Sequence, residues 1–155
     1  MKELLELTYC TKAILSWMHA AHHTTKGVSF SGDHVNLFGE IYEEIIEDFD
    51  ELIEKSISLL DDEKVACPIE LTKGSIKYLS MFESPANLNE DQIAVCALNF
   101  VRHHIGHVEF VYSALEQQRS LSLGMDDFLS SSAGKYEKFE YLLGQRIKKG
   151  YTIRR

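Results

Sequence analysis

The sequence predicts an all-α protein, and three features support this prediction. Apolar residues recur every three or four positions along four long segments, which is the spacing of one helix face. The chain of 155 residues contains two prolines, Pro68 and Pro85, both near its middle. No segment alternates apolar and polar residues between turn signals, as a half-buried strand would. Hydrophobic residues make up 45% of the chain, which is enough to bury a sizeable core.

The first two helices are predicted on either side of a turn. The first covers residues 2–25, and Gly27 follows it as a typical helix terminator. The second begins after Asp33, whose side chain is suited to capping a helix, and extends to about residue 60. The connection between them is short, so the two helices are expected to pack as an antiparallel hairpin.

A long crossover separates this hairpin from a second one. Residues 61–89 contain both prolines, and the stretch LTKGSIKYLSMF within them is expected to form a short helix. The third helix is predicted from Asn89 to about residue 118, because Asn89 and Gln92 can form a capping box. The fourth is predicted from Asp126 or Asp127 to about residue 148. Two hairpins joined by a long crossover form a ferritin-like four-helix bundle.

Composition and charge limit the organisation of the chain and its partners. Residues 1–155 are predicted to form a single domain that ends in a short basic tail at 148–155. A formal net charge of −8 disfavours general nucleic-acid binding. The tail would allow DNA contacts but equally suits a helix C-terminus, so DNA binding is not predicted. No membrane span or signal peptide is expected, and the predicted location is the cytoplasm.

Histidines gather where the first helix ends and the second begins. His19, His22 and His23 lie three and four residues apart, which places them on one side of the first helix. His34 follows the turn. Imidazoles bind first-row transition metals, but an open site of this kind also needs carboxylates.

Two carboxylates with a suitable spacing lie further along the second helix. Asp50 and Glu54 are four residues apart and share a helix face. About 16 residues of helix separate Asp50 from His34, which corresponds to roughly 24 Å at the rise of an α-helix. One straight helix cannot bring both groups to one ion. We therefore expect a shared ion to lie between two subunits related by a two-fold axis, twice in each dimer.

The third helix carries further histidines in RHHIGHVEF. His104 and His107 are three residues apart, as ligands on one helix face can be. They define a hypothesis for a second metal site, whereas histidines that pack in the core or at an interface are the default interpretation.

The run AAHHTTKGVSFSGDHVNLFGEIYEEIIEDFDELIEKSISL resembles the first hairpin of the miniferritins, the family of DNA-binding proteins from starved cells (Dps). The family pattern is similar to H-x-x-H-W, a G-x-x-F loop, a histidine, a tyrosine, and D-x-x-x-E with a basic residue. The matching residues here are His19, His22, Gly27, Phe30, His34, Tyr42, Asp50, Glu54 and Lys55. The crossover and the last helix are also similar, so the resemblance covers nearly the whole chain.

The sequence departs from this pattern in three places. His23 replaces the tryptophan after the second histidine, and Phe38 replaces an acidic residue often found one turn after His34. The interval from His34 to Tyr42 is one residue longer. These departures make Glu40 a candidate for the missing acid and leave His19 and His23 as alternative ligands beside His22.

The resemblance implies a function. It implies a ferroxidase that oxidises Fe(II) (Fe²⁺) to Fe³⁺ with hydrogen peroxide or dioxygen and stores ferric mineral, which protects against oxidative damage. The expected assembly is a hollow dodecamer built from two-fold dimers. The implied ligands are His22, His34, Asp50 and Glu54, and other divalent metals such as zinc can take the same site. Two alternatives stay open: a catalytically silent structural or DNA-associated particle, and a bundle with a di-iron site inside one subunit.

Overall fold

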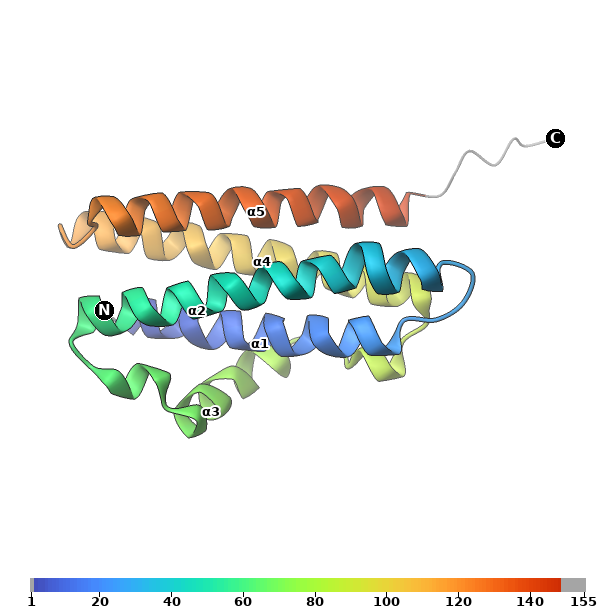
Figure 1. The fold of residues 1–155 in the computed structure, drawn as a ribbon, viewed down its shortest axis with the longest axis horizontal. Helices are drawn as coiled ribbons and strands as arrows, with labels where there is room; N and C mark the ends of the chain where they lie inside the picture. The colour runs from blue at the N-terminus through green and yellow to red at the C-terminus, as the bar shows by residue number, and fades with distance from the viewer. Residues whose placement is uncertain (1, 149–155) are drawn as a thin grey trace.

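The computed structural model describes residues 2–148, which form helices joined by short connections (Figure 1). The five α-helices are α1 Lys2–Thr24, α2 Glu40–Leu60, α3 Pro68–Leu79, α4 Glu90–Gln117 and α5 Leu123–Ile147. Three shorter helical segments are η1 Gly32–Gly39, η2 Glu63–Ala66 and η3 Pro85–Asn87. Within residues 2–148, no helix is long and apolar enough to cross a membrane.

The predicted ferritin-like bundle is confirmed. Helices α1, α2, α4 and α5 lie side by side, and the crossover from α2 to α4 carries the short helix α3 along α1 (Figure 1). The predicted basic tail, apart from Lys148, lies outside the described residues.

The capping box at the start of α4 is also confirmed. The Asn89 side chain accepts a hydrogen bond from the backbone N–H of Gln92 at 2.9 Å, and the Gln92 side chain accepts one from the backbone N–H of Asn89 at 3.0 Å.

Two of the predicted helix caps are wrong. Asp33 does not cap a helix, because its buried carboxylate instead accepts two hydrogen bonds from Arg146 Nε, at 2.9 and 3.0 Å. Helix α5 begins before Asp126 and Asp127, because Ser122 Oγ accepts the backbone N–H of Met125 at 3.1 Å. Asp126 lies in the first turn, where its charge complements the helix dipole.

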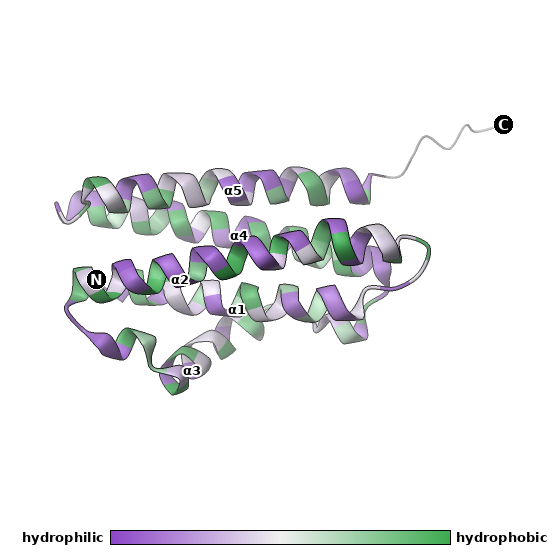
Figure 2. Ribbon diagram, viewed as in Figure 1, coloured by the Kyte–Doolittle hydropathy of each residue, from purple (hydrophilic) through white to green (hydrophobic). Residues whose placement is uncertain are grey.

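The apolar core runs along the axis of the bundle in two clusters. One lies toward the end where α1 meets η1 and is built around Ile14, Met18, Ile45 and Phe100. The other lies at the opposite end; its buried members are Leu4, Leu7, Leu52, Val108, Val111, Leu115, Met125, Phe128 and Leu129. In Figure 2, apolar and polar positions alternate along every helix, as expected for helices with one buried face.

Helix α3 packs closely on α1 through a glycine. A Cβ atom added to Gly74 would lie 2.4 Å from Cγ of the Tyr9 ring, so only glycine fits there. The hydroxyl of Tyr78 donates a hydrogen bond to Glu6 on α1 at 2.7 Å. These contacts attach the crossover to the bundle.

Gly74→Ala should lower the free energy of unfolding by about 1–3 kcal/mol, the usual cost of overpacking, despite the higher helix propensity of alanine. Urea unfolding of the purified protein measures this change. Gly106→Ala is the matched control, since no atom lies within 4 Å of an added Cβ there. It should leave stability equal or up to about 1 kcal/mol higher. If both variants behave alike, the Gly74–Tyr9 contact does not determine how α3 packs.

Candidate metal site

Two reciprocal hydrogen bonds join the end of α1 to η1. His22 Nδ1 lies 2.7 Å from the carbonyl oxygen of His34, and His34 Nδ1 lies 2.6 Å from the carbonyl oxygen of His22. A carbonyl oxygen can only accept, so each Nδ1 carries its proton and donates. Each Nε2 is therefore left with a lone pair. Metal-binding histidines are commonly oriented in this way, through the nitrogen that does not touch the metal.

The two imidazoles also stack on each other. Their planes differ by 10° and their centroids lie 4.0 Å apart. Phe30 also stacks on His34, with centroids 5.1 Å apart. Both histidines are partly buried. The pair is thus held by hydrogen bonds and by ring packing together.

His34 lies in a π-helix, and this explains how the longer interval to Tyr42 is accommodated. The segment η1, Gly32–Gly39, winds more widely than an α-helix, so one additional residue fits before α2 begins. Phe38, which replaces an acidic residue of the family pattern, is fully buried in the core. A Cβ on Gly39 would lie 2.8 Å from the carbonyl oxygen of His34 and 3.3 Å from the His22 ring. Gly39 therefore allows the two histidines to approach.

An ion pair from α5 and a hydrogen bond from α4 hold the segment that precedes His34. Arg146 on α5 binds both oxygens of Asp33, and its Nη1 lies 3.0 Å from Asp91 on α4. The hydrogen bond with Asp33 raises the pKa of Arg146. Glu90 accepts the backbone N–H of Ser29 at 3.4 Å.

The remaining histidines of this corner form a second group. His19 stacks on Tyr42 with centroids 4.5 Å apart, and His23 is edge-on to both His19 and His22. His19 and His23 are exposed. Glu40, the candidate for the missing acid, is exposed at the first position of α2.

Asp50 and Glu54 are exposed midway along α2, away from the histidines. They line a groove of about 310 Å³ between α2 and the crossover, together with Phe49, Ile53, Ala66 and Leu71. In the part of the chain that the structure describes, no three His, Cys, Asp or Glu side chains are grouped to hold a metal. A single chain therefore separates the predicted histidine and carboxylate ligands.

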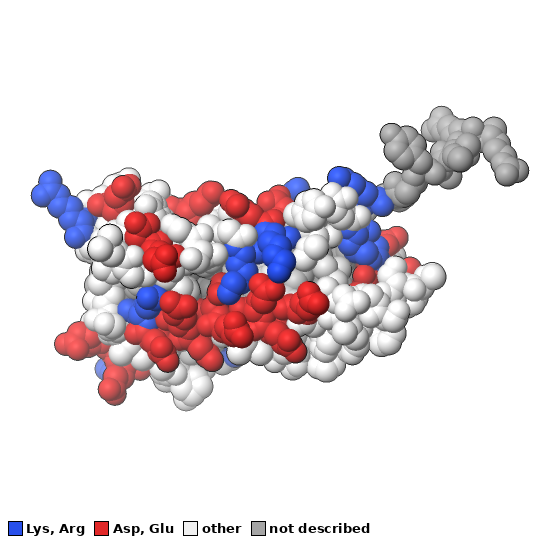
Figure 3. All heavy atoms as spheres, turned by 45° about the horizontal axis from the view of Figure 1, so that its top comes forward, with Lys and Arg blue, Asp and Glu red and all other residues white. Residues whose placement is uncertain are grey.

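The face around these carboxylates is acidic. Acidic side chains gather in a band on the face that Figure 3 shows. Helix α2 contributes exposed acids at Glu40, Glu43, Glu47, Asp50, Glu51 and Glu54. Such a surface attracts cations.

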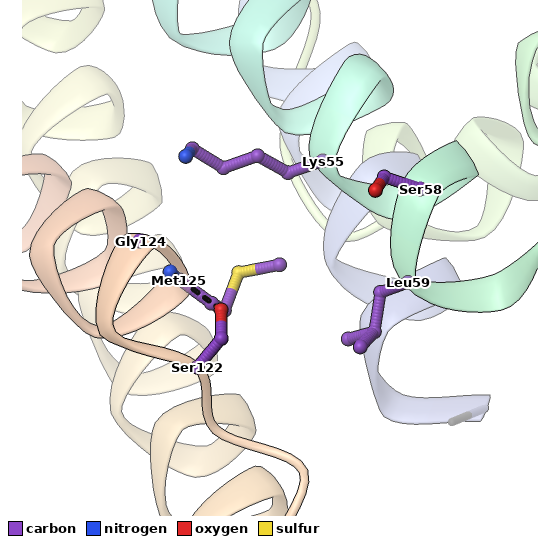
Figure 4. Close-up of a pocket in the computed structure, with 6 residues that line it drawn as sticks. All are labelled: Lys55, Ser58, Leu59, Ser122, Gly124 and Met125. Atoms are coloured by element: carbon purple, nitrogen blue, oxygen red, sulfur yellow. Dashed lines mark hydrogen bonds between the residues drawn. The ribbon is translucent and has the colours of Figure 1, made fainter.

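Lys55, the basic residue of the family pattern, borders a different cavity. This cavity, of about 300 Å³, lies between α2 and the start of α5 (Figure 4); its lining residues are Lys55, Ser58, Leu59, Ser122, Gly124 and Met125. The lining contains no carboxylate. The lysine ammonium itself lies 3.4 Å from Glu51 one turn earlier.

The structure gives the two α4 histidines of the hypothesised second site different partners. His104 is buried in the bundle core, with its Nδ1 3.4 Å from Cys10 Sγ and its ring 4.2 Å from that of Tyr136. His107 faces α3 instead, with its Nε2 3.3 Å from the Tyr78 hydroxyl.

The group around His104 was not expected from the sequence. Burial lowers the pKa of His104 to about 3 and raises that of Cys10 to about 12. The Tyr136 hydroxyl is also buried, and it has no hydrogen-bond partner among the described residues. One signal was available, since His104 lies three residues after Val101 and four before Val108, both buried.

Gly39→Ala should separate the His22 and His34 rings, because the new methyl group would overlap the His34 carbonyl oxygen. We expect a loss of about 1–3 kcal/mol in unfolding free energy together with weaker Zn²⁺ binding, measured by urea unfolding and by calorimetric titration. Gly134→Ala, at an open position of α5, is the control. It should lower neither the unfolding free energy nor the Zn²⁺ affinity. Unchanged Zn²⁺ affinity in the Gly39 variant would contradict the proposed role of this contact.

Acid should destabilise the protein through His104. The unfolded chain takes up a proton near pH 6.5, whereas the folded chain takes it up only near pH 3. The contribution of His104 is therefore constant above pH 6.5 and falls with decreasing pH, by at most about 1.4 kcal/mol per pH unit. His104→Leu should flatten the fall in unfolding free energy between pH 6 and pH 4 relative to the natural chain. Tyr136→Phe, which keeps the titrating group, should retain the slope; equal slopes in the natural chain and the leucine variant would refute the assignment.

The comparisons with known proteins agree with this architecture. No family model matches the sequence, and no curated protein is similar to it by sequence. In structure, the chain is similar to Dps from Thermosynechococcus elongatus, with a TM-score of 0.76 and 22% sequence identity over 99% of this chain and 96% of that chain. The chain therefore has the Dps-like miniferritin fold that its first-hairpin motif predicted.

Proposed function

We infer that this chain is an iron-oxidising and iron-storing protein of the miniferritin type. The observation that supports this most strongly is the pair of reciprocal hydrogen bonds between His22 and His34, which leaves both Nε2 lone pairs available for a metal. Asp50 and Glu54 of a second subunit would supply the negative charge. The Dps-like fold agrees with this proposal.

The site needs two chains because each chain contributes half of it. Two subunits packed antiparallel about a two-fold axis would place the histidine end of one over the middle of α2 of the other, twice per dimer. The proposed assembly is a hollow shell of twelve such subunits in the cytoplasm. Exposed acids on α2 would attract Fe(II) to this shell.

Iron is the substrate in this proposal. Two Fe(II) ions lose one electron each, the O–O bond of one hydrogen peroxide accepts both electrons, and the products are two Fe(III) ions and two hydroxide ions. Dioxygen is the alternative oxidant. Because both electrons pass to one peroxide, no hydroxyl radical is released.

The donor types suit this reaction. Neutral imidazoles hold Fe(II) without adding charge, and carboxylate oxygens favour the harder Fe(III) product. The hydrogen bonds at Nδ1 keep His22 and His34 from rotating when iron enters or leaves. Zn²⁺ is expected to compete for the same ligands.

The described residues do not support a di-iron site inside one subunit. Such a site needs carboxylates from several helices in the bundle interior. That interior instead contains apolar side chains with Cys10, His104 and Tyr136. Asp48 is buried nearby, but it is bound to Ser132 at 3.0 Å and paired with Lys135.

Mixing two inactive variants tests the shared site directly. The double variants His22→Gln/His34→Gln and Asp50→Asn/Glu54→Gln should each lose rapid Fe(II) oxidation by limiting peroxide, followed optically. When they are unfolded together and reassembled, half of the dimers are mixed, and one of the two sites in each mixed dimer is complete. Activity should return to about a quarter of that of the natural protein.

Assembly mass is measured on every sample so that loss of the shell is not mistaken for loss of the site. The mixture should be compared with each variant reassembled alone, which should stay inactive. An active Asp50→Asn/Glu54→Gln variant would show that these carboxylates are not ligands. Two inactive variants that fail to complement each other would contradict a site shared between chains and favour a catalytically silent or DNA-associated particle.

A further inference from the structure

The Nε2 atoms of His19 and His23 lie 3.0 Å apart on the exposed side of α1, separate from the His22–His34 pair. We propose that His19 and His23 form a second metal site, a two-imidazole chelate for a borderline divalent ion such as Cu²⁺ or Zn²⁺. This site goes beyond the proposed ferroxidase function, because it needs neither the carboxylates nor a second subunit.

The spacing of the two nitrogens fits metal binding without rearrangement of the helix. Metal–imidazole bonds are about 2.0–2.1 Å long, so two nitrogens at right angles around one ion lie about 3.0 Å apart. The contact between two Nε2 atoms also requires that one ring donate a proton and the other accept it. A divalent ion can replace that single shared proton and bind both lone pairs.

The surroundings hold one ring in place and leave the other accessible. The His19 ring stacks on Tyr42 at 4.5 Å with an interplanar angle of 14°, which limits its rotation. The His23 ring meets it edge-on, at 67°, so the two nitrogens lie at the corner between the rings. Both side chains are exposed, and water can complete the coordination of the ion.

The donors select a different class of metal from the composite iron site. Two imidazoles without a carboxylate favour Cu²⁺ and Zn²⁺ over Fe²⁺, which binds nitrogen ligands more weakly in this series. His22 is assigned to the composite site instead, because its ring is stacked on His34 and its Nδ1 donates to the His34 carbonyl, which pairs its free Nε2 with that of His34. Because His19 and His23 lie on one helix, an isolated chain should bind the ion as well as the assembly does.

The test uses the His22→Gln/His34→Gln/Asp50→Asn/Glu54→Gln protein as background, so that no imidazole or carboxylate of the composite site is left to bind Cu²⁺. One equivalent of Cu²⁺ is added, and the affinity is measured by competition with a chromophoric chelator. Electron paramagnetic resonance of the same samples reports how many imidazole nitrogens bind the ion. The background protein should bind one Cu²⁺ per chain with two nitrogens.

Three single substitutions in this background locate the ion. His19→Gln and His23→Gln should each weaken Cu²⁺ binding by at least about tenfold and remove one nitrogen from the spectrum. His107→Gln, which removes an imidazole on α4 that faces α3, should change neither. The proposal is overturned if His107→Gln weakens binding as much as His19→Gln does, or if neither His19→Gln nor His23→Gln weakens it.

Two further measurements keep these outcomes interpretable. The His19→Gln and His23→Gln variants should melt at the same temperature as the background protein, because both side chains are exposed. A variant that melts at a lower temperature is replaced by the corresponding asparagine variant. Iron oxidation is not used as a readout. Failure here would therefore leave the complementation result, and with it the proposed ferroxidase, unaffected.

Discussion

The mutual hydrogen bonding of His22 and His34 is the constraint on which this end of the molecule depends. Each ring donates to the backbone of the residue that carries the other ring, so neither can turn without releasing its partner. The bonds also close the turn between α1 and η1, because they join the two backbones as well as the two side chains. The same two hydrogen bonds therefore close the turn and leave the Nε2 atoms of both rings free.

The rest of the fold supports this contact from several directions. Arg146 and Glu90 bind the connecting segment from α5 and α4, and Gly39 leaves the space that the His22 ring occupies. Phe38 is buried in the core and anchors η1 there. Helices α4 and α5 therefore fix the connection between α1 and η1, which in turn fixes the positions of the His22 and His34 rings on either side of it.

Features that depend on neighbours in sequence could be predicted, and features that depend on distant partners could not. Helix positions and the Asn89–Gln92 capping box follow from local spacing, and both are confirmed. Asp33 has the composition of a cap, but its partner Arg146 lies 113 residues away. The start of α5 was misplaced because Ser122, Asp126 and Asp127 are all acceptable caps, and only the packing of Met125 in the core selects the first.

The candidate site shows the same division. The positions of His22 on a helix face and of His34 after the turn follow from the spacing in the sequence. The direction of each Nδ1 depends on a carbonyl group from another segment. His104 and His107 are similar in sequence, yet one faces the core and the other faces α3. His104 faces the core because it shares a helix face with the buried residues Val101 and Val108.

The π-helix has a consequence for how such sequences diverge. An extra residue in a regular α-helix rotates everything beyond it by about 100°, which would turn the whole acidic face of α2 away from its place. In η1 the added residue is absorbed within Gly32–Gly39, so a change in chain length stays local. Two proteins can then differ in length inside a helix and still superimpose along almost their full extent. Sequence alignments of such pairs should place a gap within a helix, where gaps are normally penalised most.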